Sequence, residues 1–374
     1  MSKLPNGWIE TTLGKIIKIK YGKDHQHLAE GKYPLYGSGG IMRYVENFLY
    51  TSESILIPRK GTLTNLFYVN KPFWSVDTIF YTEIDSDEVI PKFLFYKLST
   101  INLAGLNVGS AVPSLTTKVL NPLELEIPPL PEQKAIADVL SSLDEKIELL
   151  QEENKTLEEL AQTMFKEWFV NNEDSKQWKI RKLKELVTVV DNRGKTPPIV
   201  EEKTKFPLIE VNALDSKLRL INYNVIKKYV DEETYKTWFR NSLNKYDTIL
   251  ATVGTLGNFS MFLTESGNIA QNLIGISPID ISPFYIYQIL KYRRIEILKL
   301  DIGGVQPSIK VPHLLLLNIE IPPINLSNKF DSIIKPIVEK LELNYSQIQT
   351  LSETRNILLP KLMSGEIRVE GFGE

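Results

Sequence analysis

Side chains that could perform catalysis are sparse in this chain. Gly194-Lys195-Thr196 has the ending of a phosphate-binding loop, but Val189 stands where that loop needs its first glycine, and two prolines follow where its helix should begin. His25 and His27 are close in sequence, yet only one further histidine and no cysteine accompany them, so we interpret them as loop residues. The motifs of amino-methyltransferases, zinc proteases and serine hydrolases are also missing from the sequence. We therefore expect no catalytic residue, no metal and no cofactor in this chain.

Side chains suited to nucleic acid are, in contrast, frequent in glycine-flanked loops. Arginine can bond guanine through two hydrogen bonds and asparagine or glutamine can bond adenine, whereas lysine and threonine more often hold phosphates. In the first half of the chain the candidates are Arg43, Tyr44, Arg59, Lys60, Thr62, Asn65, Ser114 and Lys118. In the second half they are Arg193, Lys195, Thr196, Arg219, Asn258, Gln271, Asn272, Gln306 and Lys310. For each residue taken alone, plain exposure to solvent is the alternative.

Length and composition limit the class of protein. The 374 residues suffice for two or three domains, and 43% hydrophobic with 24% charged residues is ordinary for a globular chain. The apolar runs are too short for a membrane span, no signal peptide is visible, and the lack of cysteine excludes disulfides. We expect a cytoplasmic protein with no membrane contact. Residues 130–174 carry a net charge of −8 and residues 175–323 one of +6, so a polyanion would be repelled by the former segment.

One half of the chain repeats the other. GSAVPSLTTKVLNPLELEIPPLPEQ (109–133) returns as GGVQPSIKVPHLLLLNIEIPPINLS (303–327) at an offset of 194. SILIPRKGTLTN (54–65) returns as DTILATVGTLGN (247–258) at 193, and KYPL (32–35) as KFPL at 173. The offset jumps between about residues 36 and 53, so the second copy has roughly 20 extra residues there. The pattern predicts one domain plus one helix, duplicated.

Each copy begins with a mixed α/β domain. Apolar and β-branched runs such as SILIP and LELEIP alternate with glycine, proline and asparagine turns and with short helical patterns. We expect domains at residues 1–129 and 175–323, each followed by a helix, at residues 130–174 and 324–374. The predicted fold class is mixed α/β, with two pseudo-repeated domains separated by two long helices that pack as an antiparallel coiled coil.

The helices are predicted by a heptad seam in which spacings of four and three alternate. In the first helix the seam residues are Ile136, Leu140, Leu143, Ile147, Leu150, Asn154, Leu157, Ala161, Met164 and Trp168. In the second they are Phe330, Ile334, Ile337, Leu341, Asn344, Ile348, Leu351, Arg355, Leu358 and Leu362. Pro131 suits a helix start and Gly365 a helix stop. Pro336 and Pro360 do not fit, so the second helix either kinks or is shorter than the seam.

Two asparagines in the seam indicate how the helices pair. A parallel pair in register would place Asn344 opposite Leu150, where a buried amide lacks a partner. An antiparallel pair places Asn154 opposite Asn344, where the two amides can hydrogen-bond and fix the register. The alternative is that both asparagines lie at a wet edge of the seam.

With these features together, the chain resembles the specificity subunit of a type I restriction–modification enzyme. Two variable domains each close on a Gly…Pro-Ser…Ile-Pro-Pro segment and precede a long helix. LAQTMFKEWFVNN (160–172), RNILLPKLMSGEIRV (355–369), IPPLPEQKAIADVLSSLDEKIE and DNRGKTPP (191–198) resemble conserved stretches of that family. The second Ile-Pro-Pro continues as INLSNKF where the first has LPEQKAI, so the two docking surfaces need not be equivalent.

The resemblance implies a function and partners. Two target-recognition domains would each read half of a bipartite double-stranded DNA site, and the helices would space them and dock two modification subunits. Those partners would bind S-adenosylmethionine and methylate adenine, and restriction subunits, where present, would cut. Because the two domains differ in their loops, we expect an asymmetric target. A two-domain scaffold that binds proteins is the alternative from another class.

Overall fold

The computed structural model describes residues 4–109, 112–194, 196–214, 219–264, 266–304 and 306–372. Its contacts divide the chain into two compact units. Unit 1 comprises Met1–Ile147 and Thr350–Glu374, and unit 2 comprises Glu148–Gln349. Each unit thus contains one α/β domain together with one part of each long helix.

Unit 1 is built on an antiparallel sheet in the order β2-β8-β5-β6, with a second sheet in the order β4-β3-β7. Its elements are β1 (Ile9–Thr12), α1 (Leu13–Ile16), β2 (Ile17–Tyr21), β3 (Glu30–Gly37), β4 (Gly40–Val45), β5 (Ser54–Pro58), β6 (Phe67–Val69), β7 (Trp74–Ser75), β8 (Ile79–Ile84), α2 (Pro91–Ser99), α3 (Thr117–Leu120) and β9 (Glu124–Ile127). Strand β5 is fully buried and is apolar after Ser54, as a central strand covered on both faces requires. Strands β1 and β9 pair with each other and bring the two ends of the domain together.

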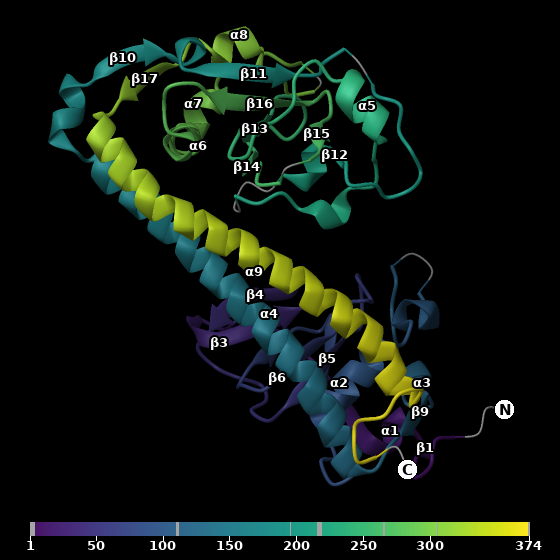
Figure 1. Cartoon of the computed structure of the whole chain (residues 1–374). Coiled ribbons are helices and arrows are strands. Elements are labelled where there is room, and N and C mark those ends of the chain that lie inside the picture. The colour runs from purple at the N-terminus through teal and green to yellow at the C-terminus, as the bar shows by residue number, and fades with distance from the viewer. Residues whose placement is uncertain are drawn as a thin grey trace. The chain divides into compact units, whose positions relative to one another are not determined.

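Unit 2 repeats this plan with the sheet order β11-β16-β13-β14, labelled in Figure 1. Its elements are β10 (Lys179–Lys182), β11 (Val187–Asp191), β12 (Leu208–Ile209), α5 (Glu232–Thr237), β13 (Thr248–Ala251), β14 (Phe259–Met261), β15 (Asn268–Ile269), β16 (Leu273–Pro278), α6 (Pro283–Tyr292), α7 (Arg294–Leu298), α8 (Val311–Leu314) and β17 (Asn318–Ile321). Strands β10 and β17 pair as β1 and β9 do.

The structure confirms the duplication strand by strand. The parallel pair β3–β7 sets Leu35 opposite Trp74, and the parallel pair β12–β15 sets Leu208 opposite Asn268. These positions differ by 173 and 194, the offsets found in the sequence. The expected insertion also lies where the offset jumps. Between its third and fifth strands unit 1 has the hairpin strand β4, whereas unit 2 has 3₁₀ turns and α5 between β12 and β13.

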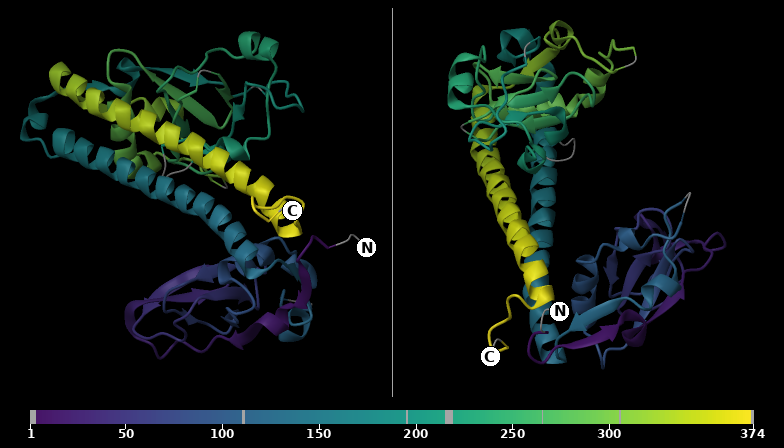
Figure 2. Two further views of the ribbon diagram at one scale, coloured as in Figure 1. Left: turned by 60° about the horizontal axis from the view of Figure 1, so that its bottom comes forward. Right: turned by 90° about the vertical axis from the view of Figure 1, so that its right-hand side faces the viewer.

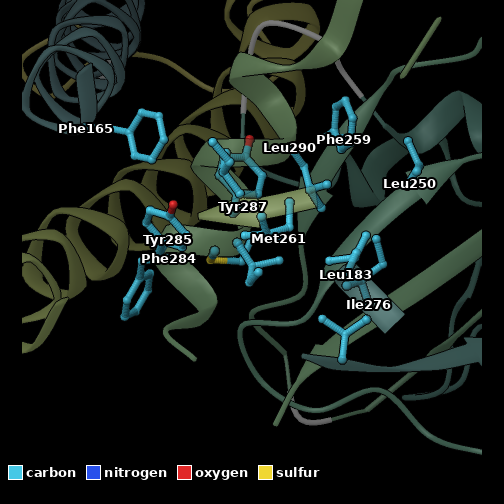
Figure 3. Close-up of a cluster of buried hydrophobic side chains, with 14 of the residues drawn as sticks. Phe165, Leu183, Leu250, Phe259, Met261, Ile276, Phe284, Tyr285, Tyr287 and Leu290 are labelled. Atoms are coloured by element: carbon cyan, nitrogen blue, oxygen red, sulfur yellow. The ribbon is translucent and has the colours of Figure 1, made fainter. Parts of the chain in front are cut away.

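Each domain core is closed by the long helices. In unit 2, α6 supplies Phe284, Tyr285, Tyr287 and Leu290 to a cluster with the sheet, and Phe165 joins it from the end of α4 (Figure 3). In unit 1, helix residues including Ile136, Leu140 and Leu362 pack with the core of that domain. The amphipathic seam of each helix therefore finds its apolar partners inside both units.

The two helices are longer than any other element. Helix α4 spans Leu130–Phe165 and continues as a π-helical turn at Lys166–Val170, and α9 spans Ile324–Ser364. Helix α9 stops at Gly365, whose positive φ of 72° is the left-handed conformation of a helix end. Pro336 and Pro360 lie inside α9 on its exposed face, where water can bond the carbonyls that a proline leaves free. Helix α9 therefore continues past both prolines, which excludes the alternative that the second helix is shorter than its seam.

The helices pair antiparallel within each unit, as Figures 1 and 2 show. In unit 2 the Asn344 amide donates to Asn154 Oδ1 at 2.9 Å, and both side chains are at least 94% buried. In unit 1 Arg355 donates to Asp144 Oδ1 at 2.8 Å, which continues the same antiparallel register. Every predicted seam residue is buried or half-buried. The predicted antiparallel pairing is confirmed, and the wet-edge alternative is excluded.

No helix within the described residues is both long enough and apolar enough to cross a lipid bilayer.

The helix register can be tested in solution because the chain contains no cysteine. We expect Asn154→Cys with Asn344→Cys to form an intramolecular disulfide under mild oxidation, since the two side chains touch. The readout is a mobility shift on a non-reducing gel. The control is Asn154→Cys with Leu362→Cys, which should stay reduced; faster cross-linking of that control would show that the register is wrong.

Candidate nucleic-acid interface

In unit 1 three loops meet beside the end of strand β5. The amide of Gly61 donates to the carbonyl of Pro113 at 3.0 Å, and the amide of Leu115 donates to the carbonyl of Arg59 at 2.9 Å. The side chain of Asn65 bonds the carbonyl of Ser38 in the Gly-Ser-Gly-Gly loop at 3.1 Å. We call the paired segments 59–61 and 113–115 the frame of unit 1. In the frame the backbone groups of the two segments satisfy each other's hydrogen bonds.

The frame and the loop that directly follows residue 61 carry five of the predicted residues of unit 1. The Arg59 guanidinium lies over the ring of Tyr21, with 5.3 Å to the ring centroid, and donates to the carbonyl of Asp77 at 2.9 Å. Lys60 and Thr62 are exposed, and Ser114 is half-buried on the segment that pairs with Lys60. The side-chain amide of Asn65 is already hydrogen-bonded to the neighbouring Gly-Ser-Gly-Gly loop. Lys60 and Thr62 are therefore the exposed side chains among these five, and both are of types that more often hold phosphates.

The remaining predicted residues of unit 1 lie outside the frame. Arg43 on β4 donates to the carbonyls of His25 at 2.7 Å and Leu28 at 3.1 Å, so its guanidinium supports a loop. Tyr44 is 52% exposed next to it. Lys118 is exposed on α3. His25 thus contributes a carbonyl to this loop, as its interpretation as a loop residue predicts, and the described residues contain no cluster of acidic, histidine or cysteine side chains that could hold a metal.

Unit 2 contains an equivalent frame with the same two backbone hydrogen bonds. The amide of Gly254 donates to the carbonyl of Pro307 at 3.1 Å, and the amide of Ile309 donates to the carbonyl of Thr252 at 2.8 Å. These four positions are the counterparts of those in unit 1 at offsets of 193 and 194. The frame of unit 2 is thus formed by segments 252–254 and 307–309. The predicted residues Gln306 and Lys310 flank it and are exposed.

A cleft of about 400 Å³ in unit 2 adjoins the frame, because the backbone amide of Thr252 donates to the carbonyl of Asn272 at 3.0 Å, and it collects three more predicted residues, Thr196, Gln271 and Asn272. Thr196, Gln271 and Asn272 are exposed at its walls. Lys228, which also lines the cleft, pairs with Glu210 at 2.7 Å, so its charge is balanced locally. The cleft therefore presents neutral amide and hydroxyl groups beside apolar side chains.

The guanidinium of Arg193 is only partly available to a nucleic acid. It forms an ion pair with Asp191 through its Nε and Nη2 atoms. Burial would raise the pKa of Asp191, but the hydrogen bonds from Arg193 outweigh it and lower that pKa. Both members of the pair are therefore charged at neutral pH, and part of the guanidinium is already bonded to the protein. Lys195 lies outside the described residues.

Two predicted contacts in unit 2 are wrong. Arg219 is fully buried, and its Nε donates to Glu158 of α4 at 2.8 Å. Asn258 is 9% exposed, and its amide donates to the carbonyl of Leu214 at 3.1 Å. Both side chains are therefore held inside unit 2 by these hydrogen bonds.

Glu158 is the residue that the sequence did not reveal as the partner of Arg219. Burial would raise its pKa, but the charges of Arg219 and Lys291 outweigh burial and hold the pKa below its usual range. Lys291 Nζ lies 3.5 Å from the second carboxylate oxygen. The one available signal is that Glu158 directly follows the seam residue Leu157, so it lies at the edge of the buried stripe.

These features define a class: a chain in which one mixed α/β domain occurs twice, with the same loop frame in each copy and different exposed side chains on it. Comparison with known proteins gives this class a family. The family model for the type I restriction modification DNA specificity domain matches residues 5–159 and 175–353. The chain therefore belongs to the type I restriction–modification specificity family, as the resemblance in the sequence predicted, and is a DNA sequence-recognition subunit of such a system.

Individual relatives agree. The chain is 27% identical over 349 residues to the type I restriction enzyme MjaIX specificity subunit of Methanocaldococcus jannaschii, covering 86% of this chain and 79% of the relative. It is 22% identical over 417 residues to the MjaVIII specificity subunit of the same organism, covering 99% and 95%. The crystal structure of the type I restriction–modification system S subunit from M. genitalium has the same fold, with a TM-score of 0.72 and 20% identity over 96% of this chain and 97% of that one.

The Glu158–Arg219 pair should be essential for unit 2. Glu158→Gln leaves a fully buried guanidinium without a counter-charge, and we expect a loss of about 3–5 kcal/mol in the free energy of unfolding at pH 7. Urea denaturation measures it, and Glu159→Gln, on the exposed side of the same helix, is the matched control. Equal stability of the two variants would contradict the assignment.

The same pair predicts a pH dependence. Because the pKa of Glu158 is lowered in the folded chain, its contribution is complete above the ordinary carboxyl pKa of about 4.3 and is lost as the pH falls through the lower folded pKa. The stability gap between the wild type and Glu158→Gln should therefore be constant near neutrality and narrow in acid. A gap that widened below pH 4 would have the wrong sign.

Proposed function

We propose that this chain is the non-catalytic subunit that selects the target of a type I restriction–modification complex. Each unit reads one half of a bipartite, asymmetric site in double-stranded DNA. Two modification subunits bind S-adenosylmethionine, dock on the chain and methylate adenine; restriction subunits, where present, add cleavage. The complex acts on cytoplasmic DNA.

One observation carries the proposal: the same frame occurs in both units with different side chains on it. The frame of unit 1 has Arg59 and Lys60 at the positions where the frame of unit 2 has Thr252 and Val253. Two identical readers would match a palindrome, whereas two readers with one frame and different surfaces match two different half-sites. The duplicated architecture thus favours a target that is split and asymmetric.

The starts of the two long helices, beside which we propose that the modification subunits dock, also differ between the copies. At the start of α4, Glu132 is fully buried and binds the Arg368 guanidinium through two hydrogen bonds of 2.6 and 2.8 Å. Gln133 is equally buried and accepts the amide hydrogen of Ile90 at 2.8 Å. The corresponding positions at the start of α9 are Leu326 and Ser327, which cannot repeat these bonds. Two partner subunits would therefore meet non-equivalent helix ends.

Exchange of one domain tests the proposal. Replacing residues 7–129 with the corresponding domain of a relative should change one half of the methylated sequence and leave the other half intact, because each unit has its own frame and core. Sequencing of methylated DNA from cells that carry the chimaera and its modification subunits gives the readout. The reciprocal exchange of residues 177–323 is the control and should change the other half. A change in both halves, or in neither, would refute modular reading.

The non-catalytic role has its own test. We expect the purified chain, incubated with S-adenosylmethionine and duplex DNA but no partner subunit, to transfer no methyl group and to leave the DNA uncut. Addition of the modification subunits to the same mixture is the positive control. Methyl transfer by the chain alone, measured with labelled cofactor, would overturn the proposal.

A further inference from the structure

A loop next to the frame of unit 1 is held by one side chain. The Oδ1 atom of Asn107 accepts hydrogen bonds from the backbone amides of Gly109 and Ser114, each 2.8 Å long. The amide of Val108 also donates to the carbonyl of Ser114 at 3.0 Å. Asn107 therefore ties both ends of the loop together.

Unit 2 carries the same device at an offset of 194. The Oδ1 atom of Asp301 accepts hydrogen bonds from the backbone amides of Gly303 and Ser308, again 2.8 Å each. The amide of Ile302 donates to the carbonyl of Ser308 at 3.0 Å. These hydrogen bonds lower the pKa of Asp301, so the acceptor is a carboxylate at neutral pH. An amide in one copy and a carboxylate in the other thus perform the same task.

Close packing of the backbone explains why both copies of the loop have a glycine at the same position. A Cβ atom on Gly109 would lie 2.0 Å from the carbonyl oxygen of Val112, and one on Gly303 would lie 2.0 Å from the carbonyl oxygen of Gln306. No side chain fits at that distance, so the backbone of residue 112 or 306 packs directly on the glycine. Residues 112 and 306 therefore occupy equivalent positions in the two units.

These equivalent positions carry different, accessible side chains. Val112 is 55% exposed. Gln306 is exposed, and its Nε2 atom lies 3.9 Å from the place of a Cβ on Gly254, next to the frame. Glutamine can bond adenine through two hydrogen bonds, whereas an apolar side chain can contact the methyl group of thymine. The same loop conformation thus presents side chains with different base preferences in the two units.

We propose that Val112 and Gln306 each read a base pair in their half of the DNA target, and that Asn107 and Asp301 are the positioning residues that hold these readers in place. The inference rests on the proposed function, since it assumes that the frame faces DNA. It accounts for the Gly…Pro-Ser segment that the chain repeats: the glycine admits the returning carbonyl, the proline carbonyl joins the frame, and the serine amide binds the positioning residue.

The reading residues are tested with the chain assembled with its modification subunits, on duplexes that carry every single substitution of the methylated target. Gln306→Ala should lose discrimination at one base pair in one half, with affinity for the target falling about 5- to 150-fold, the equivalent of one bidentate contact. Val112→Ala should relax one base pair in the other half only. The exposed Gln177 provides the control Gln177→Ala, which should bind as the wild type does.

The positioning residues are tested by rescue. Asp301→Ala removes the acceptor and should relax the same base pair as Gln306→Ala, whereas Asp301→Asn keeps an oxygen at that place and should restore discrimination. Asn107→Ala and Asn107→Asp should behave in the same way for the other half. A merely structural role would lower the urea midpoint without changing the base preference. Equal loss of discrimination in Asp301→Ala and Asp301→Asn would overturn the positioning role.

The outcomes separate this inference from the proposed function. If the wild-type complex shows no sequence preference on these duplexes, the proposed function fails and the inference fails with it. If the wild-type complex reads a split target, and the Gln306→Ala variant discriminates at every base pair as well as the wild type does, the proposed function stands and this inference is wrong.

Discussion

The buried hydrogen bond between Asn154 and Asn344 determines which residues of the two long helices face each other. The donating Asn344 nitrogen and the accepting Asn154 oxygen avoid the cost of about 1–3 kcal/mol that a buried unpaired polar group would carry. A shift of the register by one heptad would separate the two asparagines and set each amide against an apolar side chain. It would also move Phe330 away from Phe165 and Phe169, whose rings it contacts in the core of unit 2. The helix register and the domain core thus depend on each other.

The duplication uses one fold twice, and part of the variation between the two copies lies on the surface. Paired strands, the parallel strand pair and the loop frame recur with the same hydrogen bonds. The differences include exposed side chains on the frame and the segment between the third strand and the central sheet, where β4 in unit 1 is replaced by α5 in unit 2. They also include the buried Glu132, whose counterpart is Leu326. Under the proposed function, the half of the target that one unit reads could therefore change without disturbing the core of the other unit.

Much of this could be predicted from the sequence because it depends on periodicity and repetition. The heptad spacing predicted both helices, the two asparagines predicted their antiparallel register, and the offsets predicted the matched strands. The prediction failed where a distant partner decides the role of a side chain. Arg219 belongs to a basic segment and suggested exposure, but Glu158, 61 residues earlier, buries it. Asn107 and Asp301 were overlooked because an amide and a carboxylate look unrelated until their identical hydrogen bonds are seen.

The central claim is that the loops beside the two frames face DNA, and site-specific photo-cross-linking tests it most directly. A photoreactive amino acid placed at residue 112 or 306 of the full chain, in complex with its modification subunits and target duplex, should cross-link to DNA. The two positions should mark different halves of the target. Ile9 in unit 1 and Ile295 in unit 2, which are 55% and 71% exposed, provide control positions that should not cross-link to DNA. DNA adducts at the control positions, with none at residues 112 and 306, would contradict the account.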